Sequence, residues 1–477
     1  MMPAISPSAT SADSVKRLLP WLVAVAFFME ALDTTIINTA VPTIAGALEV
    51  GPLSLKAALT SYTLSLAVFI PVSGWVADRF GTRRVFAAAV VIFTLGSLLS
   101  GLSVSLPMLV GSRIVQGFGG AMMMPVGRIA MVRTFPKSEL LKAMSFVVIP
   151  GLIGPTLGPL VGGLIVHFLH WRMIFFVNIP IGLLGLYLIL RHMPDYRLAQ
   201  PAPLDGTGFV LFGLGIALLS YVLEVFGEHG MGTGGVLFLL AVAISLLALY
   251  WRHAMSLARP LLRLDLFATR TFRVAVIGSF LTRLGVGGMP FLLPLLYQIG
   301  LGFQAWQAGL LLMPQALAAM SMKMIVQRIL TRFGYRRVLI VNTCLIGLTI
   351  ALFATVTSAT PVWLIVLQAF LFGFFSSLHY SSVNTLVFTD LGDADTSMGS
   401  SISSTVQQLS ISFGIALASL ITGLFLGGAT DAAVPQMTRA IHYAFIVLGA
   451  VTVMSTLLFS RLRPTDGQSV SRYGQGK

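Results

Sequence analysis

Long apolar runs alternate with short polar segments from one end of the chain to the other. Each run has about the 20 residues that an α-helix needs to cross the hydrocarbon core of a bilayer. No segment between the runs is long enough to hold a soluble domain, so the pattern predicts an all-α integral membrane protein with fourteen transmembrane helices. The fourteen runs cover residues 19–42, 55–77, 85–105, 107–130, 142–166, 172–191, 207–226, 234–252, 273–297, 305–328, 338–357, 361–386, 399–427 and 439–460.

The composition excludes several classes of protein. Of the 477 residues, 56% are hydrophobic and only 10% are charged, against about 25% charged in soluble domains. The net charge of +14 does not indicate nucleic-acid binding, because the basic residues lie in short clusters between apolar runs. The single cysteine, Cys344, permits no intramolecular disulfide. The sequence has no metal-ligand cluster, nucleophile motif or G-x-x-x-x-G-K-S/T loop, so we expect no enzyme, no cofactor or metal, and no ATP-driven pump.

The lysines and arginines set the predicted orientation. With the N-terminus in the cytoplasm, cytoplasmic segments contain 24 of the 30 and the opposite side contains three, as the positive-inside rule requires. An even number of spans then places both termini in the cytoplasm, with the chain in the cytoplasmic (inner) membrane. The loop at 387–398 departs from the pattern, because it carries three aspartates and no base. Arg113, Arg283 and Lys323 lie within spans; the last two have no evident role, although either would favour an anionic substrate.

An internal repeat divides the chain into two related halves. "DRFGTRRV" at 78–85 reappears as "TRFGYRRV" at 331–338, each time between two spans on the cytoplasmic side. Duplicated helix bundles suit a transporter, because two similar bundles can rock about a central site. The predicted domains are a cytoplasmic tail at 1–18, a six-helix bundle at 19–191, two inserted helices with a cytoplasmic connector at 192–272, a second six-helix bundle at 273–460, and a cytoplasmic tail at 461–477.

The first copy of the repeat belongs to a longer motif, "GWVADRFGTRRV". We expect Gly74 and Gly81 to allow a close backbone approach, and Asp78 to cap a helix or to pair with an arginine. By composition alone this is an ordinary basic cytoplasmic loop. In the second copy Gln327 and Thr331 replace Gly74 and Asp78, so any acidic latch is expected only in the first half. The bases of the motif are Arg79, Arg83 and Arg84.

The spacing of Gly, Asp-Arg, Gly and Arg-Arg in this motif resembles the cytoplasmic signature of the major facilitator superfamily. The resemblance implies the major facilitator fold, here with two extra helices between the six-helix bundles. It also implies that the loop helps to hold the two halves together and is released as the transporter switches.

A second motif, "RIVQGFGGAMMMP", places an arginine within the fourth span. Arg113, Gln116, Gly117 and Gly120 share one helical face at spacings of three and four residues. An arginine in hydrocarbon needs an anionic or carbonyl partner unless it extends to the membrane surface from near a helix end. The motif resembles the second signature of the superfamily. The resemblance implies that Arg113 takes part in proton coupling.

A third motif, "GLIGPTLGPLVGG", carries small residues along one stripe of the fifth span. Small residues at this spacing let two helices approach closely, and Pro155 adds a bend. The motif is similar to the Gly-Pro motif of the antiporters of the superfamily, so the resemblance implies export. The glycines of the stripe are Gly151, Gly154, Gly158 and Gly162.

Two further stretches resemble marks of the fourteen-span drug/proton antiporters within the superfamily. They are "ALDTTIINTAVP" in the first span and "WRMIFFVNIPIG" at the start of the sixth. The resemblance implies a proton-coupled exporter of amphipathic small molecules that works as a monomer in a lipid bilayer. A transporter of a specific metabolite, siderophore or amino acid is the alternative.

The first span has a polar arc in an apolar helix. On a helix of 3.6 residues per turn, Glu30, Asp33, Thr34 and Asn38 fall within about 140°. Asp33 lies about 20 Å into the span at 1.5 Å per residue, so the arc must face a partner helix or a cavity. Our hypothesis is that Asp33 is the main carrier of the proton, with Glu30 as an accessory or cation-binding site and Arg113 tuning both. A permanent Asp33–Arg113 salt bridge that only fixes the helices is the alternative.

Other polar residues within spans are predicted to line the substrate cavity. His379 can titrate, but a lone histidine in a membrane is more often a hydrogen-bonding group. The residues predicted to line the cavity are Asn38, Gln116, His379, Tyr380, Asn384 and Gln407.

Overall fold

The computed structural model describes residues 9–199, 201, 203–225, 232–392, 395–427 and 433–467. Every regular element in these ranges is a helix, which agrees with the all-α prediction. The ends of the two predicted tails, 1–8 and 468–477, lie outside the described residues, as does one aspartate of the 387–398 loop, Asp393.

The first half of the chain, α1 to α8, contains six long helices and four short elements. The long helices are α1 (Ala9–Ile36), α3 (Lys56–Phe80), α4 (Thr82–Gly101), α5 (Leu106–Thr134), α6 (Lys137–Phe168) and α8 (Asn178–His192). The short elements are η1 (Asn38–Ala40), α2 (Val41–Ala47), η2 (Pro52–Leu55) and α7 (Met173–Phe176).

Two helices, α9 (Gly206–Val225) and α10 (Thr233–Ser256), separate this part from the second half, α11 to α18. A 3₁₀ turn, η3 (Leu264–Ala268), follows α10. The second half contains α11 (Arg270–Leu295), the π-helical η4 (Leu296–Gly300), α12 (Ala305–Met322), α13 (Val326–Phe333), α14 (Tyr335–Leu352), η5 (Phe353–Thr355), α15 (Val362–Leu386), α16 (Thr396–Leu426), α17 (Val434–Met454) and α18 (Thr456–Phe459).

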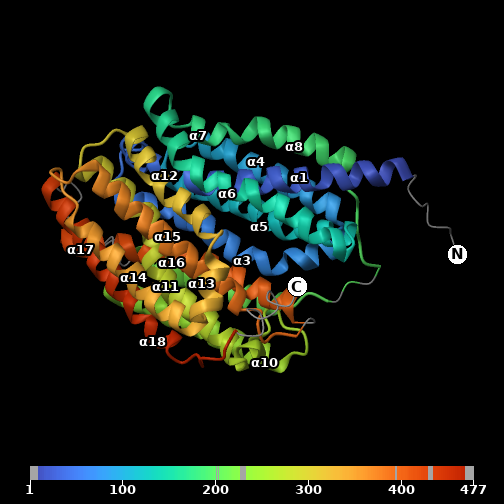
Figure 1. The fold of residues 1–477 in the computed structure, drawn as a ribbon. Coiled ribbons are helices and arrows are strands. Elements are labelled where there is room, and N and C mark those ends of the chain that lie inside the picture. The colour runs from blue at the N-terminus through green and yellow to red at the C-terminus, as the bar shows by residue number, and fades with distance from the viewer. Residues whose placement is uncertain are drawn as a thin grey trace.

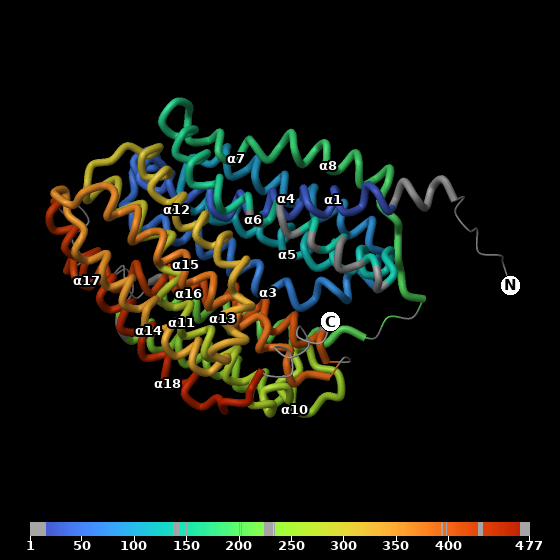
Figure 2. Tube along the Cα trace, in the orientation of Figure 1, coloured from blue at the N-terminus to red at the C-terminus, as the bar shows by residue number. Residues whose placement is uncertain are grey.

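The two halves lie side by side. Figures 1 and 2 show the first-half helices, blue to green, on one side and the second-half helices, yellow to red, on the other. The halves meet where α6 packs against α12 and where α3 packs against α16. The exact domain boundaries expected from the sequence stay a prediction.

Eleven helices among the described residues are long and apolar enough to cross a membrane, and twelve if α12 and α13, which meet at a 60° bend, form one span. This confirms a multi-span membrane protein. In α5, Arg113, Gln116 and the glycines lower the mean hydropathy, so this helix is not among the eleven. The count of fourteen therefore stays a prediction.

The inserted helices are anchored at Asp205, which lies just before α9. Its carboxylate accepts hydrogen bonds from His253 Nε2 of α10 at 2.8 Å and from the backbone N–H groups of Gly208 and Leu261 at 2.8 and 3.0 Å. Burial raises the pKa of Asp205, but these bonds lower it by more, and the pKa lies below its usual value of 3.8. One carboxylate thus fixes α9, α10 and the connector that follows.

The glycine stripe of α6 packs directly on α1. A Cβ atom at Gly154 would lie 2.9 Å from the backbone N of Leu32, and one at Gly162 would collide with the carbonyl of Ile36. Gly151 and Gly158 meet the side chains of Phe27 and Thr35 in the same way. The close helix approach expected from the stripe is confirmed.

The same stripe continues into the contact between the halves, which the sequence did not predict. Gly163 lies against the backbone of Ala305 and Trp306, with its ideal Cβ 2.8 Å from the Cα of Trp306. Across the contact Gly309 lies against Pro159 and Leu160. Glycines on both helices therefore bring α6 and α12 into backbone contact.

Replacement of Gly162 by alanine tests the α1–α6 contact. The added methyl must displace the backbone of Ile36, and such overpacking costs about 1–3 kcal/mol. We expect a lower apparent melting temperature of the purified protein in detergent. Gly185→Ala is the matched control, because Gly185 of α8 has no atom within 4 Å of its ideal Cβ. Equal melting temperatures for the two variants would contradict the close approach.

Candidate functional site

Asp33 and Arg113 form an ion pair in the interior of the first half. Arg113 Nη1 of α5 donates to Asp33 Oδ2 of α1 at 2.6 Å, and the two side chains are 1% and 0% exposed. The alternative in which this arginine extends to the membrane surface is therefore wrong, because it has a buried anionic partner. Such a pair is tolerated in a low-dielectric interior only when both groups are also hydrogen-bonded.

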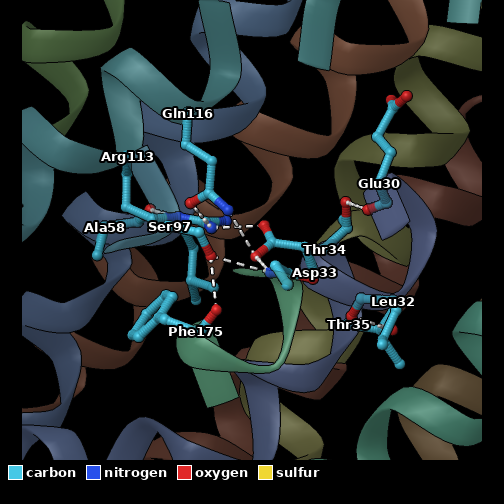
Figure 3. A network of polar contacts seen from close by, with 12 residues as sticks. Glu30, Leu32, Asp33, Thr34, Thr35, Ala58, Ser97, Arg113, Gln116 and Phe175 are labelled. Carbon is cyan, nitrogen blue, oxygen red and sulfur yellow. Dashed lines mark hydrogen bonds and ion pairs between the residues drawn. The ribbon is translucent and has the colours of Figure 1, made fainter. Parts of the chain in front are cut away.

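The second carboxylate oxygen of Asp33 is held by two amides (Figure 3). Oδ1 accepts from Gln116 Nε2 at 2.8 Å and from Asn178 Nδ2 at 3.0 Å. Asn178 also donates to Ser97 Oγ at 3.0 Å, and Ser97 in turn donates to the carbonyl of Phe175 at 2.8 Å. The network therefore joins α1, α4, α5 and α8.

Arg113 has partners of its own besides the aspartate. Nη1 donates to Gln116 Oε1 at 2.7 Å, and Nε lies 3.4 Å from the carbonyl of Ala58 in α3. Its guanidinium carbon lies 4.1 Å from the centre of the Tyr62 ring, a cation–π contact. The positive charge is thus compensated on one side and covered by an aromatic face on the other.

The sequence predicted three members of this network and missed two. Arg113 and Gln116 share a face as the helical spacing suggested, and the hypothesis that Arg113 acts on Asp33 agrees with their contact, whereas Asn178 and Ser97 were not expected. Asn178 lies in "WRMIFFVNIPIG". This stretch indicated a resemblance to a subfamily, but it did not indicate which residue Asn178 contacts.

Glu30 lies apart from the network. Its side chain extends away from Asp33 and Arg113 (Figure 3), is 9% exposed, and its Oε2 has no hydrogen-bond partner among the described residues. One turn later, Thr34 Oγ1 donates to the backbone carbonyl of Glu30 at 2.7 Å. Glu30 is thus a buried carboxylate without a salt bridge in the described part of the chain.

Asn38 does not continue the helical arc. The prediction placed it on the same helix as Asp33, but α1 ends at Ile36 and Asn38 begins the 3₁₀ turn η1. Pro42 follows at the start of α2 and has no N–H with which to continue an α-helix across this point. Asn38 remains buried, at 7% exposure.

The polar residues expected in the second half do not join the Asp33 network. His379 is fully buried, with its ring 5.5 Å from that of Phe459 and its Nδ1 3.4 Å from Thr343 Oγ1. This environment suits the hydrogen-bonding interpretation of His379. Asn384 is exposed and Gln407 is half-buried, and their place in a substrate cavity stays a prediction.

The cytoplasmic motif contains an ion pair within the first half. Asp78 Oδ1 lies 2.6 Å from Arg133 Nη2 of α5, so the pairing with an arginine occurs, whereas the residue that precedes α4 is Gly81. Gly81 has φ of +96°, and a Cβ there would collide with the carboxylate of Asp195. Gly74 has no atom within 4 Å of its ideal Cβ, so the close approach expected at this glycine is wrong.

The acidic loop at 387–398 binds the connector before α11 and the first turn of α11. Thr271 Oγ1 donates to Asp390 at 2.8 Å, and Arg263 Nη1 donates to Asp395 at 2.5 Å. Asp390 and Asp395 of the loop thus each have a partner at the start of the second half. Among the described residues no three His, Cys, Asp or Glu side chains gather closely enough to hold a metal ion.

Residues 23–415 match the family model of the Major Facilitator Superfamily. The chain belongs to the Major Facilitator Superfamily. It is 41% identical over 448 residues to "Putative multidrug resistance protein MdtD" of Serratia proteamaculans (strain 568), covering 94% of this chain and 93% of the relative. The protein of the same name from Escherichia coli O6:K15:H31 (strain 536 / UPEC) is 41% identical over 463 residues, covering 96% and 97%.

Solved transporters share the fold of this superfamily member. The nucleoside transporter NupG superposes with a TM-score of 0.65 at 15% identity, covering 92% of this chain and 98% of that one. The POT family transporter PepTSo superposes with a TM-score of 0.68 at 13% identity, covering 97% and 99%. The resemblance of the motifs to the Major Facilitator Superfamily is confirmed, and the protein is a multi-pass membrane transporter rather than an enzyme.

A double-mutant cycle tests the ion pair. Asp33→Asn and Arg113→Gln each leave one charge unpaired in the interior, which costs about 3–5 kcal/mol. We expect the double variant to be destabilised by clearly less than the sum of the two, measured as melting temperature in detergent.

The exposed pair Lys16–Glu139, at 3.1 Å, is the matched control for this cycle. Surface pairs contribute only about 0–1 kcal/mol, so its single and double variants should be near wild type. Additive losses for Asp33 and Arg113 would contradict the coupling seen in the structure.

Proposed function

We propose that the protein is a drug/proton antiporter that exports amphipathic small molecules across the bacterial cytoplasmic (inner) membrane by alternating access. The observation that carries the proposal is the buried Asp33, whose cationic partner Arg113 lies on a different helix. The name of the MdtD relatives supports multidrug export. A monomer with both termini in the cytoplasm and fourteen spans, as in the antiporter subfamily that the motifs resemble, is part of the proposal.

The span count of fourteen requires helices beyond the eleven that pass on length and hydropathy. In this proposal α5 and α6 each cross the membrane, and α12 with α13 forms one bent span. Polar residues are tolerated in α5 because Arg113 and Gln116 are satisfied by Asp33. The spans of α9 and α10 then complete a six-plus-two-plus-six arrangement.

Protonation of Asp33 would change the balance of charge in the first half. While Asp33 is ionised, its charge compensates that of Arg113 and the amides of Gln116 and Asn178 donate to it. A proton on Asp33 removes the ion pair and leaves Arg113 as an uncompensated buried charge, which is costly in a low-dielectric interior. Relief of that cost by rearrangement of the helices is how we propose that proton binding drives the switch, with Glu30 as an accessory site.

Motion between the halves would occur at their contacts. Glycines bring the backbones of α6 and α12 into contact, and α16 reaches α3 through Ser412 Oγ, which lies 3.3 Å from the carbonyl of Thr60. The same helix, α16, also meets α5, where Arg128 Nη1 donates to Ser400 Oγ at 3.1 Å. Polar links of this kind can be broken and remade in a rocking cycle.

The proton gradient supplies enough free energy for this exchange. One charge that crosses about 100 mV yields about 2.3 kcal/mol, and each pH unit adds about 1.4 kcal/mol. One proton could thus sustain a substrate gradient of tens- to several-hundred-fold. A one-for-one exchange with a monovalent cation moves no net charge, so only the pH difference would drive it.

A transporter of a specific metabolite, siderophore or amino acid is the alternative. It would share the fold and the Asp33 site and differ in the groups that bind the substrate. A screen of drugs and metabolites in cells that express the protein separates the two.

Replacement of Asp33 by asparagine tests proton coupling. In inverted membrane vesicles with an acidified interior, we expect wild type to accumulate ethidium. The variant should accumulate it at a rate at least ten-fold lower, because asparagine cannot bind and release the proton. Asp265→Asn is the matched control, since Asp265 is 56% exposed and lies outside the spans. Accumulation by Asp33→Asn that still depends on the pH gradient would overturn the assignment.

A further inference from the structure

A second arginine is buried among the helices of the second half. Arg283 of α11 is 5% exposed, and the sequence from 266 to 389 contains no aspartate or glutamate. Within the described part of the chain, no salt bridge includes it. A buried arginine in a membrane protein requires an anionic or carbonyl partner, and the described residues supply Arg283 with no acidic one.

The contacts of Arg283 leave most of its donors unused. Its Nε donates to Ser279 Oγ at 3.0 Å, and its guanidinium carbon lies 4.1 Å from the centre of the Tyr380 ring on α15. A guanidinium has five N–H donors. The two terminal nitrogens have no hydrogen-bond partner among the described residues, and they are not fully enclosed. They form the edge with which arginine binds carboxylates through two parallel hydrogen bonds.

A comparison with Arg113 shows what is different about this site. Both guanidinium carbons lie 4.1 Å above a tyrosine ring, Tyr62 in one case and Tyr380 in the other. Arg113 has Asp33 against its terminal nitrogen, whereas no carboxylate of the second half lies within a helix that could reach Arg283. The aromatic support is shared, and only the anion is not provided by the described residues.

Glu30 does not supply the missing anion to Arg283. Its Oε2 is also without a partner among the described residues, and the hydrogen bond of Arg283 in that part of the chain goes to Ser279 instead. An aromatic contact alone contributes about 0.5–2 kcal/mol, which does not compensate for a buried charge.

We propose that Arg283 binds a carboxylate, or another planar anionic group, of the exported compound, with Tyr380 holding the guanidinium plane in place. The proposal rests on the proposed export function and adds a substrate class to it, amphipathic compounds that carry an anionic group, alongside cations such as ethidium. Arginine is suited to this recognition because its planar fork pairs with both oxygens of a carboxylate. Lysine offers only a point charge.

The class of substrate changes the electrical balance of the exchange. Export of a monovalent anion against entry of one proton moves two positive charges inward, and a zwitterion moves one. A membrane potential that is negative inside the cell therefore accelerates export of these compounds, in contrast to the exchange of a monovalent cation.

Two dyes that differ only in one carboxylate test the site. Rhodamine 110 has a free carboxylate and rhodamine 123 is its methyl ester, and fluorescence polarisation measures their binding to the purified full chain in lipid nanodiscs. We expect wild type to bind rhodamine 110 at least ten-fold more tightly than the ester, as a charge-assisted bidentate contact provides. Arg283→Gln should abolish this ratio and Arg283→Lys should keep part of it.

Arg273→Gln is the matched control, because it removes an arginine from the first turn of the same helix, where Arg273 donates to the carbonyl of Phe267. Its affinity ratio should equal that of wild type. Since the ratio of two ligands is measured within each variant, a general loss of folding does not mimic the result. A wild type that prefers the ester, binds both equally or does not bind the carboxylate would overturn the proposal, as would an unchanged ratio in Arg283→Gln.

Ethidium export separates failure of this site from failure of the proposed function. If wild type drives ethidium with the pH gradient but shows no carboxylate preference, the exporter assignment holds and the Arg283 proposal is wrong. If the carboxylate preference depends on Arg283 but no compound moves with the pH gradient, the binding site holds and proton-coupled export is wrong.

Discussion

A charge inside a membrane protein must be compensated where it lies, and in this protein that constraint organises the first half. Compensation of Asp33 requires Arg113 from α5, Gln116 one turn further along, and Asn178 at the start of α8. Arg113 in turn reaches the carbonyl of Ala58 in α3. Five helices are therefore linked to one carboxylate, either directly or through Arg113, Asn178 and Ser97.

The glycines of α6 connect the helix that carries Asp33 to the second half. Gly162 of α6 contacts α1, the helix that carries Asp33. The next residue, Gly163, contacts the backbone of α12. Only a single helix therefore separates the proton-carrying candidate from the other half of the molecule. The second half has its own buried arginine beside a tyrosine but no acidic residue in its helices, so the two halves share a scaffold and differ in charge.

The helices themselves were predictable because hydropathy is a property of consecutive residues. The run expected at 107–130 corresponds to α5, and the stripe of Gly154 and Gly162 indicated the close packing of α6. The end of α1 at Ile36 was missed, since the residues of η1 and α2 are nearly as apolar as those of the helix. Contacts between helices, such as Asn178 with Asp33, were not predictable, because spacing along one helix does not tell which neighbour a side chain faces.

The inserted helix α9 lies over the line along which the halves meet on one side. It packs against α3 of the first half and α16 of the second, with the ring of Phe209 5.7 Å from that of Phe69 and the ideal Cβ of Gly213 3.2 Å from Val68. Lipid acyl chains are therefore kept from that seam. Among the described residues neither α9 nor α10 packs in the same way on the opposite seam, between α6 and α12, so the extra pair of helices makes the transporter asymmetric toward the membrane.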